Sequence, residues 1–280
     1  MHGRTSAVSG ATEARVFHYS GRPIVTTSLR PDPAAAIQAR GLADRIGGVF
    51  IGREGRPLSE LLAGGCPVVV VQADRVVCHQ GDHPFFFHPG LTRMRMRGGP
   101  GGRVEPLIEA LQVSPGDRVL DATLGRAGDA ILISHEVGAE GRIVGLEASP
   151  VVAEIIRLGL ATAPGVTPEI EAAMRRIEVV CARHEEYLAG CADGSFDVVY
   201  FDPMFDLPLS GSTSIEPLRP LACHDPLVRD TIEQAARVAR RRVVIKSRKG
   251  SALLDDLGIK EISGGTWSRL AYGIVRTGEG

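Results

Sequence analysis

The 280-residue sequence has few cysteines, few aromatic residues and no long apolar run. Its five cysteines include no C-x-x-C pair, which argues against a disulfide framework and favours a reducing compartment such as the cytoplasm. No apolar run approaches the roughly 18 residues that cross a bilayer, so we expect no membrane span. Residues 1–20 lack the apolar core of a secretory signal, and we expect a flexible lead-in there.

The sequence also has almost no net charge, with a formal value of −1. Two stretches depart from this balance. Residues 91–103 carry four arginines and no acid, and residues 240–249 carry six basic residues and no acid. A solvated basic surface is the simpler interpretation of such stretches. Contact with an anion or a nucleic acid is the alternative.

Residues 21–97 have the pattern of a small α+β domain. The run IVTT predicts a strand, and Asp32-Pro33 provides an N-cap and a first-turn proline for an Ala-rich helix. VFI predicts another strand, and a short helix is expected near 58–63. The runs VVVVQ and VVCHQ flank Ala73-Asp74-Arg75, which indicates a hairpin.

A glycine-rich break at 98–102 is the best candidate for a linker, and residues 98–280 have a different rhythm. The runs DRVLDAT, GRIVGLEAS, RIEVVCA, FDVVYFD and RRVVIKS predict five strands, with helical patterns between most of them. This alternation predicts an α/β fold with a Rossmann-like, doubly wound, mostly parallel sheet. KEISGGTWS and LAYGIVRTG predict an antiparallel pair of strands at the sheet edge.

Acidic residues end three of the predicted parallel strands: Asp121, Glu147 and Asp202. Ligands of such sheets bind beyond the carboxyl ends of the strands, so these side chains should converge. They would repel the pyrophosphate of a dinucleotide, but they suit a cationic, adenosine-containing sulfonium, whose ribose Glu147 can bind. In the alternative interpretation, Asp121 and Gly128 only cap a helix.

Two further groups of residues near these strand ends are candidates for the cofactor site. Glycines after the first strand allow a ligand to approach the backbone closely. Arg183 and His184 follow the third strand and could contact adenine, or could form an ordinary surface pair. The complete set of candidate cofactor residues is Asp121, Ala122, Thr123, Gly125, Gly128, Asp129, Glu147, Ala148, Arg183, His184 and Asp202.

Three motifs, DRVLDATLGRAGD, VGLEAS and DVVYFDPMF, resemble those of class I S-adenosylmethionine-dependent methyltransferases. Asp202-Pro-Met-Phe205 is similar to the D/N-P-P-Y/F tetrapeptide of enzymes that methylate exocyclic amines of nucleobases. Together with the N-terminal α+β segment, it resembles the bacterial small-subunit ribosomal RNA methyltransferase J family and its uncharacterised relatives. That resemblance implies S-adenosyl-L-methionine as cofactor and a guanine N2 amine of ribosomal RNA as the methyl acceptor.

The tetrapeptide also makes chemical sense by itself. An aromatic amine is a poor nucleophile because its lone pair is delocalised into the ring. Asp202 and the carbonyl of Pro203 can accept hydrogen bonds from both N–H groups and turn the lone pair outward, while Phe205 can stack on an extruded base. Met204 replaces the usual second proline, which leaves guanine, adenine and cytosine open. A simple turn with Phe205 in the core is the alternative.

Polar and basic residues elsewhere are weaker candidates for substrate contacts. The loop around Ser212 could cover the substrate or be an ordinary loop, and Lys246 and Arg248 could meet phosphates or be exposed charges at the sheet end. The candidate RNA-contacting residues are Arg93, Arg95, Arg97, Ser212, Lys246 and Arg248. The spacing of the cysteine and histidines at 78–88 matches no zinc pattern, so no metal is predicted.

The sequence thus predicts a cytoplasmic methyltransferase that acts on an exocyclic amine, with guanine in ribosomal RNA as the leading substrate. A methyltransferase for a small molecule or a protein amide is the second hypothesis, because amide nitrogens pose the same lone-pair problem. A non-catalytic protein that binds RNA or the cofactor is the third. The sequence does not determine the oligomeric state.

Overall fold

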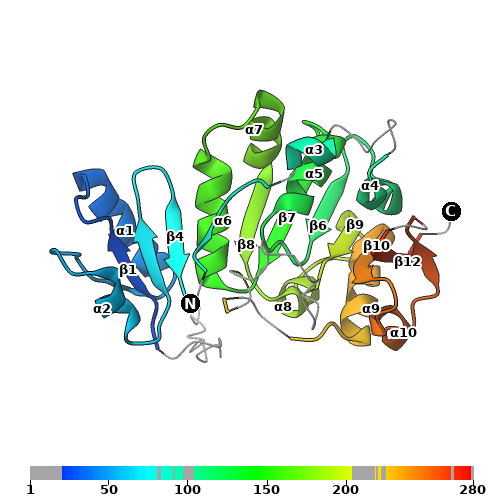
Figure 1. The fold of residues 1–280 in the computed structure, drawn as a ribbon. Helices are drawn as coiled ribbons and strands as arrows, with labels where there is room; N and C mark the ends of the chain where they lie inside the picture. Colours follow the sequence, from blue (N-terminus) through cyan, green and yellow to red (C-terminus); the bar gives the residue numbers. More distant parts are fainter. Residues whose placement is uncertain are drawn as a thin grey trace, which may run out of the picture.

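The computed structural model describes residues 21–80, 83–90, 92–96, 104–203, 218, 220–221, 225–265 and 268–278. A small N-terminal unit lies beside a larger α/β unit, and helix α6 of the larger unit faces it (Figure 1). None of the described helices is long and apolar enough to cross a membrane.

The N-terminal unit is a five-stranded sheet with the order β2-β1-β3-β4-β5. Its elements are β1 (Ile24–Thr27), α1 (Pro33–Arg45), β2 (Val49–Phe50), α2 (Leu58–Leu62), β3 (Val68–Val71), β4 (Val76–His79) and β5 (Phe85–Phe86).

Most of this unit follows the predicted elements. Asp32 is the N-cap of α1, since its carboxylate accepts a hydrogen bond of 2.7 Å from the backbone N–H of Ala35. β3 and β4 form the predicted antiparallel hairpin. The sequence did not indicate that β1 pairs in parallel with both β2 and β3, nor that β5 extends the sheet, because two-residue strands and long-range pairings leave little local pattern.

The larger unit contains a seven-stranded sheet with the order β11-β12-β10-β9-β6-β7-β8. Its strands are β6 (Arg118–Asp121), β7 (Arg142–Glu147), β8 (Ile177–Cys181), β9 (Phe196–Phe201), β10 (Ala239–Arg248), β11 (Glu261–Ser263) and β12 (Leu270–Arg276). The first five are parallel, and β12 and β11 add an antiparallel edge. The predicted doubly wound sheet with an antiparallel pair of edge strands is therefore confirmed.

Helices cover both faces of this sheet, because its strands alternate apolar side chains between the two faces. Val119 and Ile143 belong to one buried cluster and Leu120 and Val144 to the other. The first face is covered by α4 (Pro106–Leu111), α5 (Gly128–Val137), α6 (Pro150–Thr162) and α7 (Pro168–Arg175), and the second by α8 (His184–Ala189), α9 (Arg229–Val238) and α10 (Leu253–Asp256).

The strand order places the ends of β6, β7 and β9 side by side. β6 pairs with β7, the next strand along the chain, on one side and with β9 on the other. The direction of winding reverses at β6, so a crevice for a ligand is expected beyond its carboxyl end.

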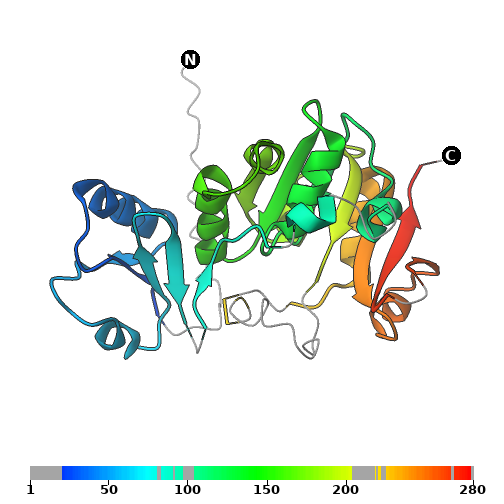
Figure 2. The same cartoon turned by 45° about the horizontal axis from the view of Figure 1, so that its top comes forward.

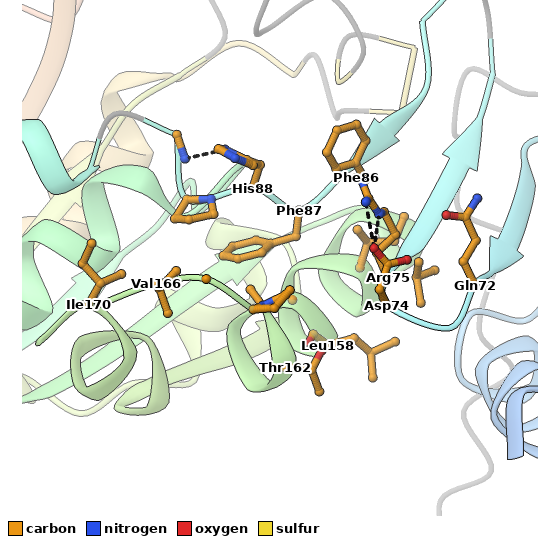
Figure 3. A pocket seen from close by; sticks show the side chains of 18 of the residues that line it. Gln72, Asp74, Arg75, Phe86, Phe87, His88, Leu158, Thr162, Val166 and Ile170 are labelled. Atoms are coloured by element: carbon orange, nitrogen blue, oxygen red, sulfur yellow. Dashed lines mark hydrogen bonds and ion pairs between the residues drawn. The ribbon is translucent and has the colours of Figure 1, made fainter. Parts of the chain in front are cut away.

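The two units share a packed seam. Arg45 of α1 lies 2.7 Å from the carboxylate of Glu154 on α6. Phe87, just after β5, packs on Gly159 of α6 so closely that a Cβ at Gly159 would lie 2.1 Å from the ring. A cavity of about 540 Å³ opens beside Phe87, between the hairpin residue Arg75 and the α6–α7 region (Figure 3).

After β5 the chain crosses the larger unit to α3 (Thr92–Met96), which packs against α5 (Figure 2). The last helix before the predicted linker therefore contacts the larger unit, although the expected boundary at 97/98 assigns it to the N-terminal domain. The boundary stays a prediction, and the linker itself lies outside the described residues.

Candidate active site

Three acids end neighbouring parallel strands at the edge predicted for the site. Asp121 ends β6, Glu147 ends β7, and Asp202 directly follows β9. Asp121 is 1% exposed and Glu147 is 8% exposed, whereas the side chain of Asp202 keeps 30% of its surface open. The register aligns the ends of the strands, because Asp121 pairs with Tyr200 and Gly145 in the two neighbouring strands.

The loop between β6 and α5 is held close to the sheet by its own backbone. The N–H of Leu124 donates to the carbonyl of Leu146 at 2.8 Å, and Gly125 and Ala127 adopt positive φ angles of 49° and 62°. Leu124 also packs on Gly145, where a Cβ would lie 2.5 Å from its side chain. A Cβ at Gly128 would meet no atom within 4 Å, so the start of α5 borders open space.

Glu147 lies under this loop and is tied to it. Its carboxylate accepts a hydrogen bond of 2.8 Å from the N–H of Ser149 and further backbone hydrogen bonds from Gly125 and Ala148. Burial nevertheless raises the pKa of Glu147 to about 7, because three donors do not replace the lost hydration. Such a carboxylate gains from a ligand that supplies hydroxyl donors.

Asp121 is buried and close to other acids. Burial, together with the charges of Asp129 and Asp202, raises the pKa of Asp121 to about 8, although the N–H of Thr123 donates to it at 3.1 Å. Lys246 offsets only part of this effect. Asp121 would therefore become ionised at neutral pH if a positively charged ligand bound beside it.

Lys246 forms ion pairs with both Asp129 and Asp202. We call these three residues, together with Asp121, the acid cluster. Nζ of Lys246 lies 2.8 Å from Oδ2 of Asp202 and 2.9 Å from Oδ2 of Asp129. Asp129, in the first turn of α5, also accepts hydrogen bonds from Arg95 at 2.5 Å and from the hydroxyl of Tyr200 at 2.7 Å.

Asp202 and Pro203 follow β9 as the sequence predicts. The N–H of Asp202 donates to Oγ1 of Thr123 at 2.5 Å, which ties the end of β9 to the loop after β6. Ala122 reinforces the same junction, because its N–H donates to the carbonyl of Tyr200 at 2.8 Å. Met204 and Phe205 lie outside the described residues, so the predicted stacking ring stays a prediction.

Arg183 and His184 lie at the start of α8, beside the end of β8. Arg183 pairs with Asp225, and the ring of His184 packs edge-on against Phe201 at 5.6 Å between centroids. Burial lowers the pKa of His184. Among the described residues, Nε2 of His184 is buried without a hydrogen-bond partner, although Oε1 of Glu185 is 3.3 Å away. A nitrogen of this kind suits a ligand that can hydrogen-bond to it.

The candidate RNA-contacting residues occupy different environments. Arg95 and Lys246 point into the network of acids, and their side chains are 27% and 15% exposed. Arg93 is exposed on α3, and Arg248 is half-buried. Arg97 and Ser212 lie outside the described residues. A role in contacting phosphate stays a prediction for all six.

The basic stretch 240–249 is largely engaged within the protein. Arg241 pairs with Asp117, and Arg242 donates to the carbonyl of Ala110 at 3.1 Å. Arg240 donates to the carbonyl of Gly194 at 2.6 Å. These three arginines therefore bind other parts of the protein, so the stretch is more than the solvated basic surface of the simpler interpretation.

Sequence reasoning missed two members of the network, Tyr200 and Glu105. Tyr200 lies in an apolar strand and looked like core, yet a buried tyrosine hydroxyl needs a partner, which was the available signal. Glu105 is the N-cap of α4 and also pairs with Arg95 at 2.6 Å. Its second role depends on the crossing of α3 over α5, which no local pattern shows.

The groups at the strand ends fit a cationic, adenosine-containing cofactor. Two carboxyl groups, Asp121 and Glu147, have raised pKa values, and open space borders Gly128. A positive charge would stabilise ionised Asp121, and ribose hydroxyls would satisfy Glu147. Within the described ranges, no group of three or more His, Cys, Asp or Glu side chains could hold a metal ion.

Comparison with known proteins gives one family and one fold. Residues 82–269 match the model of the family described as "Putative SAM-dependent methyltransferase". The chain also resembles the structure of a SAM-dependent methyltransferase from Neisseria gonorrhoeae, with a TM-score of 0.61 and 17% identity over 91% of this chain and 96% of that one. At this identity, the likeness shows the shared Rossmann-like fold.

Two curated relatives are similar in sequence. The uncharacterized protein YpiP of Bacillus subtilis is 36% identical over 257 residues, which cover 91% of this chain and 99% of YpiP. Ribosomal RNA small subunit methyltransferase J of Laribacter hongkongensis is 32% identical over 184 residues, which cover 63% of each chain. From the fold, the site and these matches, we conclude that the chain belongs to the SAM-dependent methyltransferase family and uses S-adenosyl-L-methionine as its cofactor.

Proposed function

We propose that this methyltransferase acts on an exocyclic amine of a nucleobase, with guanine N2 of ribosomal RNA as the substrate group. The observation that carries the proposal is the position of Asp202. Its carboxylate lies in the same acid cluster as Asp121, at the end of the central strands, and its side chain is 30% exposed.

The geometry of the strand ends supports a proposed set of cofactor contacts. Glu147 would accept hydrogen bonds from the ribose hydroxyls, and Asp121 would face positive charge on the methionine part. The backbone of Gly125 and Gly128 would border the cofactor, with Ala122, Thr123 and Asp129 shaping the loop. Ala148 and the pair Arg183 and His184 would lie on the adenine side, where Nε2 of His184 can accept or donate a hydrogen bond.

The reaction needs little covalent chemistry from the protein. When bound, the cofactor would supply a methyl group on a sulfonium, whose S–C electron pair would go to sulfur as the nitrogen takes the methyl group. Asp202 and the carbonyl of Pro203 would accept the two N–H groups and direct the lone pair of nitrogen at the methyl carbon. The surplus proton on nitrogen leaves after transfer, to Asp202 or to water. Positioning of this kind can lower the barrier by about 7–11 kcal/mol.

The choice of RNA as substrate draws on the relatives. The Laribacter protein is named a ribosomal RNA small subunit methyltransferase, and another of that name, from Dechloromonas aromatica, is 29% identical over 60% of this chain. We propose guanine N2 from the resemblance to the ribosomal RNA methyltransferase J family, and Phe205 would provide the surface on which the base stacks.

A loss-of-function strain and one substitution test this proposal. Nucleosides of ribosomal RNA from a strain without the protein should lack one methylated guanine, as measured by mass spectrometry. In vitro, Asp202→Ala should lower methyl transfer to small subunits from that strain by about 100-fold or more, a loss typical of a preorganised acceptor. Cofactor affinity, measured by calorimetry, should stay within about threefold, because Asp202 faces the amine rather than the ribose.

The matched control is Asp44→Ala, at an exposed aspartate of α1 far from the strand ends, which should leave transfer unchanged. An equal loss of transfer and cofactor binding in Asp202→Ala would contradict the assigned role. An unchanged nucleoside profile, together with transfer to a small molecule or a protein amide, would replace RNA by that substrate.

A further inference from the structure

Lys246 is a nearly buried ammonium group at the edge where β10 leaves the core. Its side chain is 15% exposed, and Nζ lies between two carboxylates, 2.8 Å from Asp202 and 2.9 Å from Asp129. Both distances are those of charge-assisted hydrogen bonds. One of these ion pairs therefore joins the ammonium group of Lys246 to Asp202, the residue that is proposed to hold the amine.

Asp129 fixes Lys246 independently of Asp202. Its Oδ1 accepts from Arg95 at 2.5 Å, and its Oδ2 accepts from the hydroxyl of Tyr200 at 2.7 Å. Arg95 is held in turn by Glu105 at 2.6 Å. Side chains from α3, β9 and β10 thus converge on one carboxylate of α5, and the ammonium group keeps a fixed anchor when Asp202 exchanges its partners.

Asp202 needs a cation for electrostatic reasons. Burial and the neighbouring Asp129 raise the pKa of Asp202, and Lys246 and Arg95 oppose that rise. Asp121, at the end of β6, is the third acid of the cluster, and its charge also interacts with that of Asp202. Without Lys246, the carboxyl would hold a proton at higher pH, and a protonated carboxyl offers an O–H donor where the amine needs an acceptor.

We propose that Lys246 is the positioning residue that holds Asp202 as an ionised, correctly oriented acceptor for the substrate amine, and that Asp129 with Arg95 keeps Lys246 in place. This inference rests on the proposed function, since it assumes that Asp202 accepts the N–H of an amine. It assigns Lys246 a role through Asp202, in place of a contact with RNA phosphate.

The test compares Lys246→Gln and Lys246→Arg with Lys260→Gln, which makes the same change at an exposed lysine before β11. We expect Lys246→Gln to move the acidic limb of the kcat–pH profile up by about 1–3 pH units, the usual effect of removing an opposite charge at this distance. Cofactor affinity should change little. Lys246→Arg should restore most of the profile, and Lys260→Gln should match the wild type.

A second measurement does not depend on any substrate. Titration of 13C-labelled aspartate carboxyls by NMR, assigned with Asp202→Asn, should show a higher pKa of Asp202 in Lys246→Gln than in the wild type. An unshifted limb in a folded, cofactor-binding Lys246→Gln would overturn the inference, as would an unchanged pKa of Asp202.

The two measurements separate this inference from the proposed function. If the wild type methylates no RNA but the NMR titration shows the shift, the proposed substrate is wrong and the charge coupling stands. If the wild type methylates RNA and Lys246→Gln keeps the wild-type limb, the proposed function stands and the positioning role fails.

Discussion

At the scale of single residues, two buried carboxyl groups of the site, Asp121 and Glu147, are harder to ionise than usual. Burial raises the pKa values of Asp121 and Glu147 to about 8 and about 7. In the unfolded chain both groups ionise near pH 4, so between about pH 4 and 8 these two carboxyl groups bind more protons in the folded protein than in the unfolded chain. Their contribution to stability is therefore greatest below pH 4 and falls as pH rises to about 8.

The same groups predict how cofactor binding depends on pH. Because the cofactor is positively charged, it favours ionised Asp121, and its affinity should rise from pH 6 to pH 8 as protons leave. Calorimetry across this range should show a smaller rise in cofactor affinity for Asp121→Asn than for the wild type. The cofactor's own amine also titrates in this range, but it affects both proteins equally. Equal slopes for the two proteins would mean that Asp121 does not sense the cofactor.

At the scale of elements, the close packing of Phe87 on Gly159 of α6 is a contact between the N-terminal unit and the larger unit. Gly159→Ala should destabilise the protein by about 1–3 kcal/mol, because a Cβ there would lie 2.1 Å from the ring of Phe87. Urea unfolding measures the change. In a Phe87→Gly background, which removes the ring and also the Cβ of residue 87 that would lie 2.2 Å away, the same substitution should be neutral or stabilising, by up to about 1 kcal/mol from helix propensity.

Gly41→Ala in α1 is the control, since its Cβ would meet only the end of the Arg45 side chain, at 3.4 Å. This substitution should be neutral or slightly stabilising. A similar loss from Gly159→Ala with phenylalanine and with glycine at position 87 would show that the Phe87 side chain is not the cause.

At the scale of the whole molecule, the near-zero net charge limits how strongly RNA can be attracted. Arg95 and Lys246 are engaged inside the site, and phosphate contacts by Arg93, Arg97 and Arg248 stay predictions. Three such contacts would give a slope of about −2 to −3 for log affinity against log salt concentration.

Fluorescence anisotropy with a ribosomal RNA fragment at increasing salt concentration tests this expectation. Arg93→Gln should make the slope shallower by about 0.7–0.9, the value of one phosphate contact. Arg142→Gln removes an exposed charge at the amino end of β7, the end of the strand away from the site, and should leave the slope unchanged. A flat response in the wild type would favour a small-molecule substrate.

The sequence by itself determined the succession of strands and helices and the acids at the strand ends, because alternation of apolar runs, caps and turn glycines is local information. Asp121, Glu147 and Asp202 could be placed together since parallel strands end at one edge. Only the tertiary structure decided the partners of those acids. Arg95, Tyr200 and Lys246 meet Asp129 through the crossing of α3 and the register of β9 and β10, and none of these three contacts follows from neighbours in the chain.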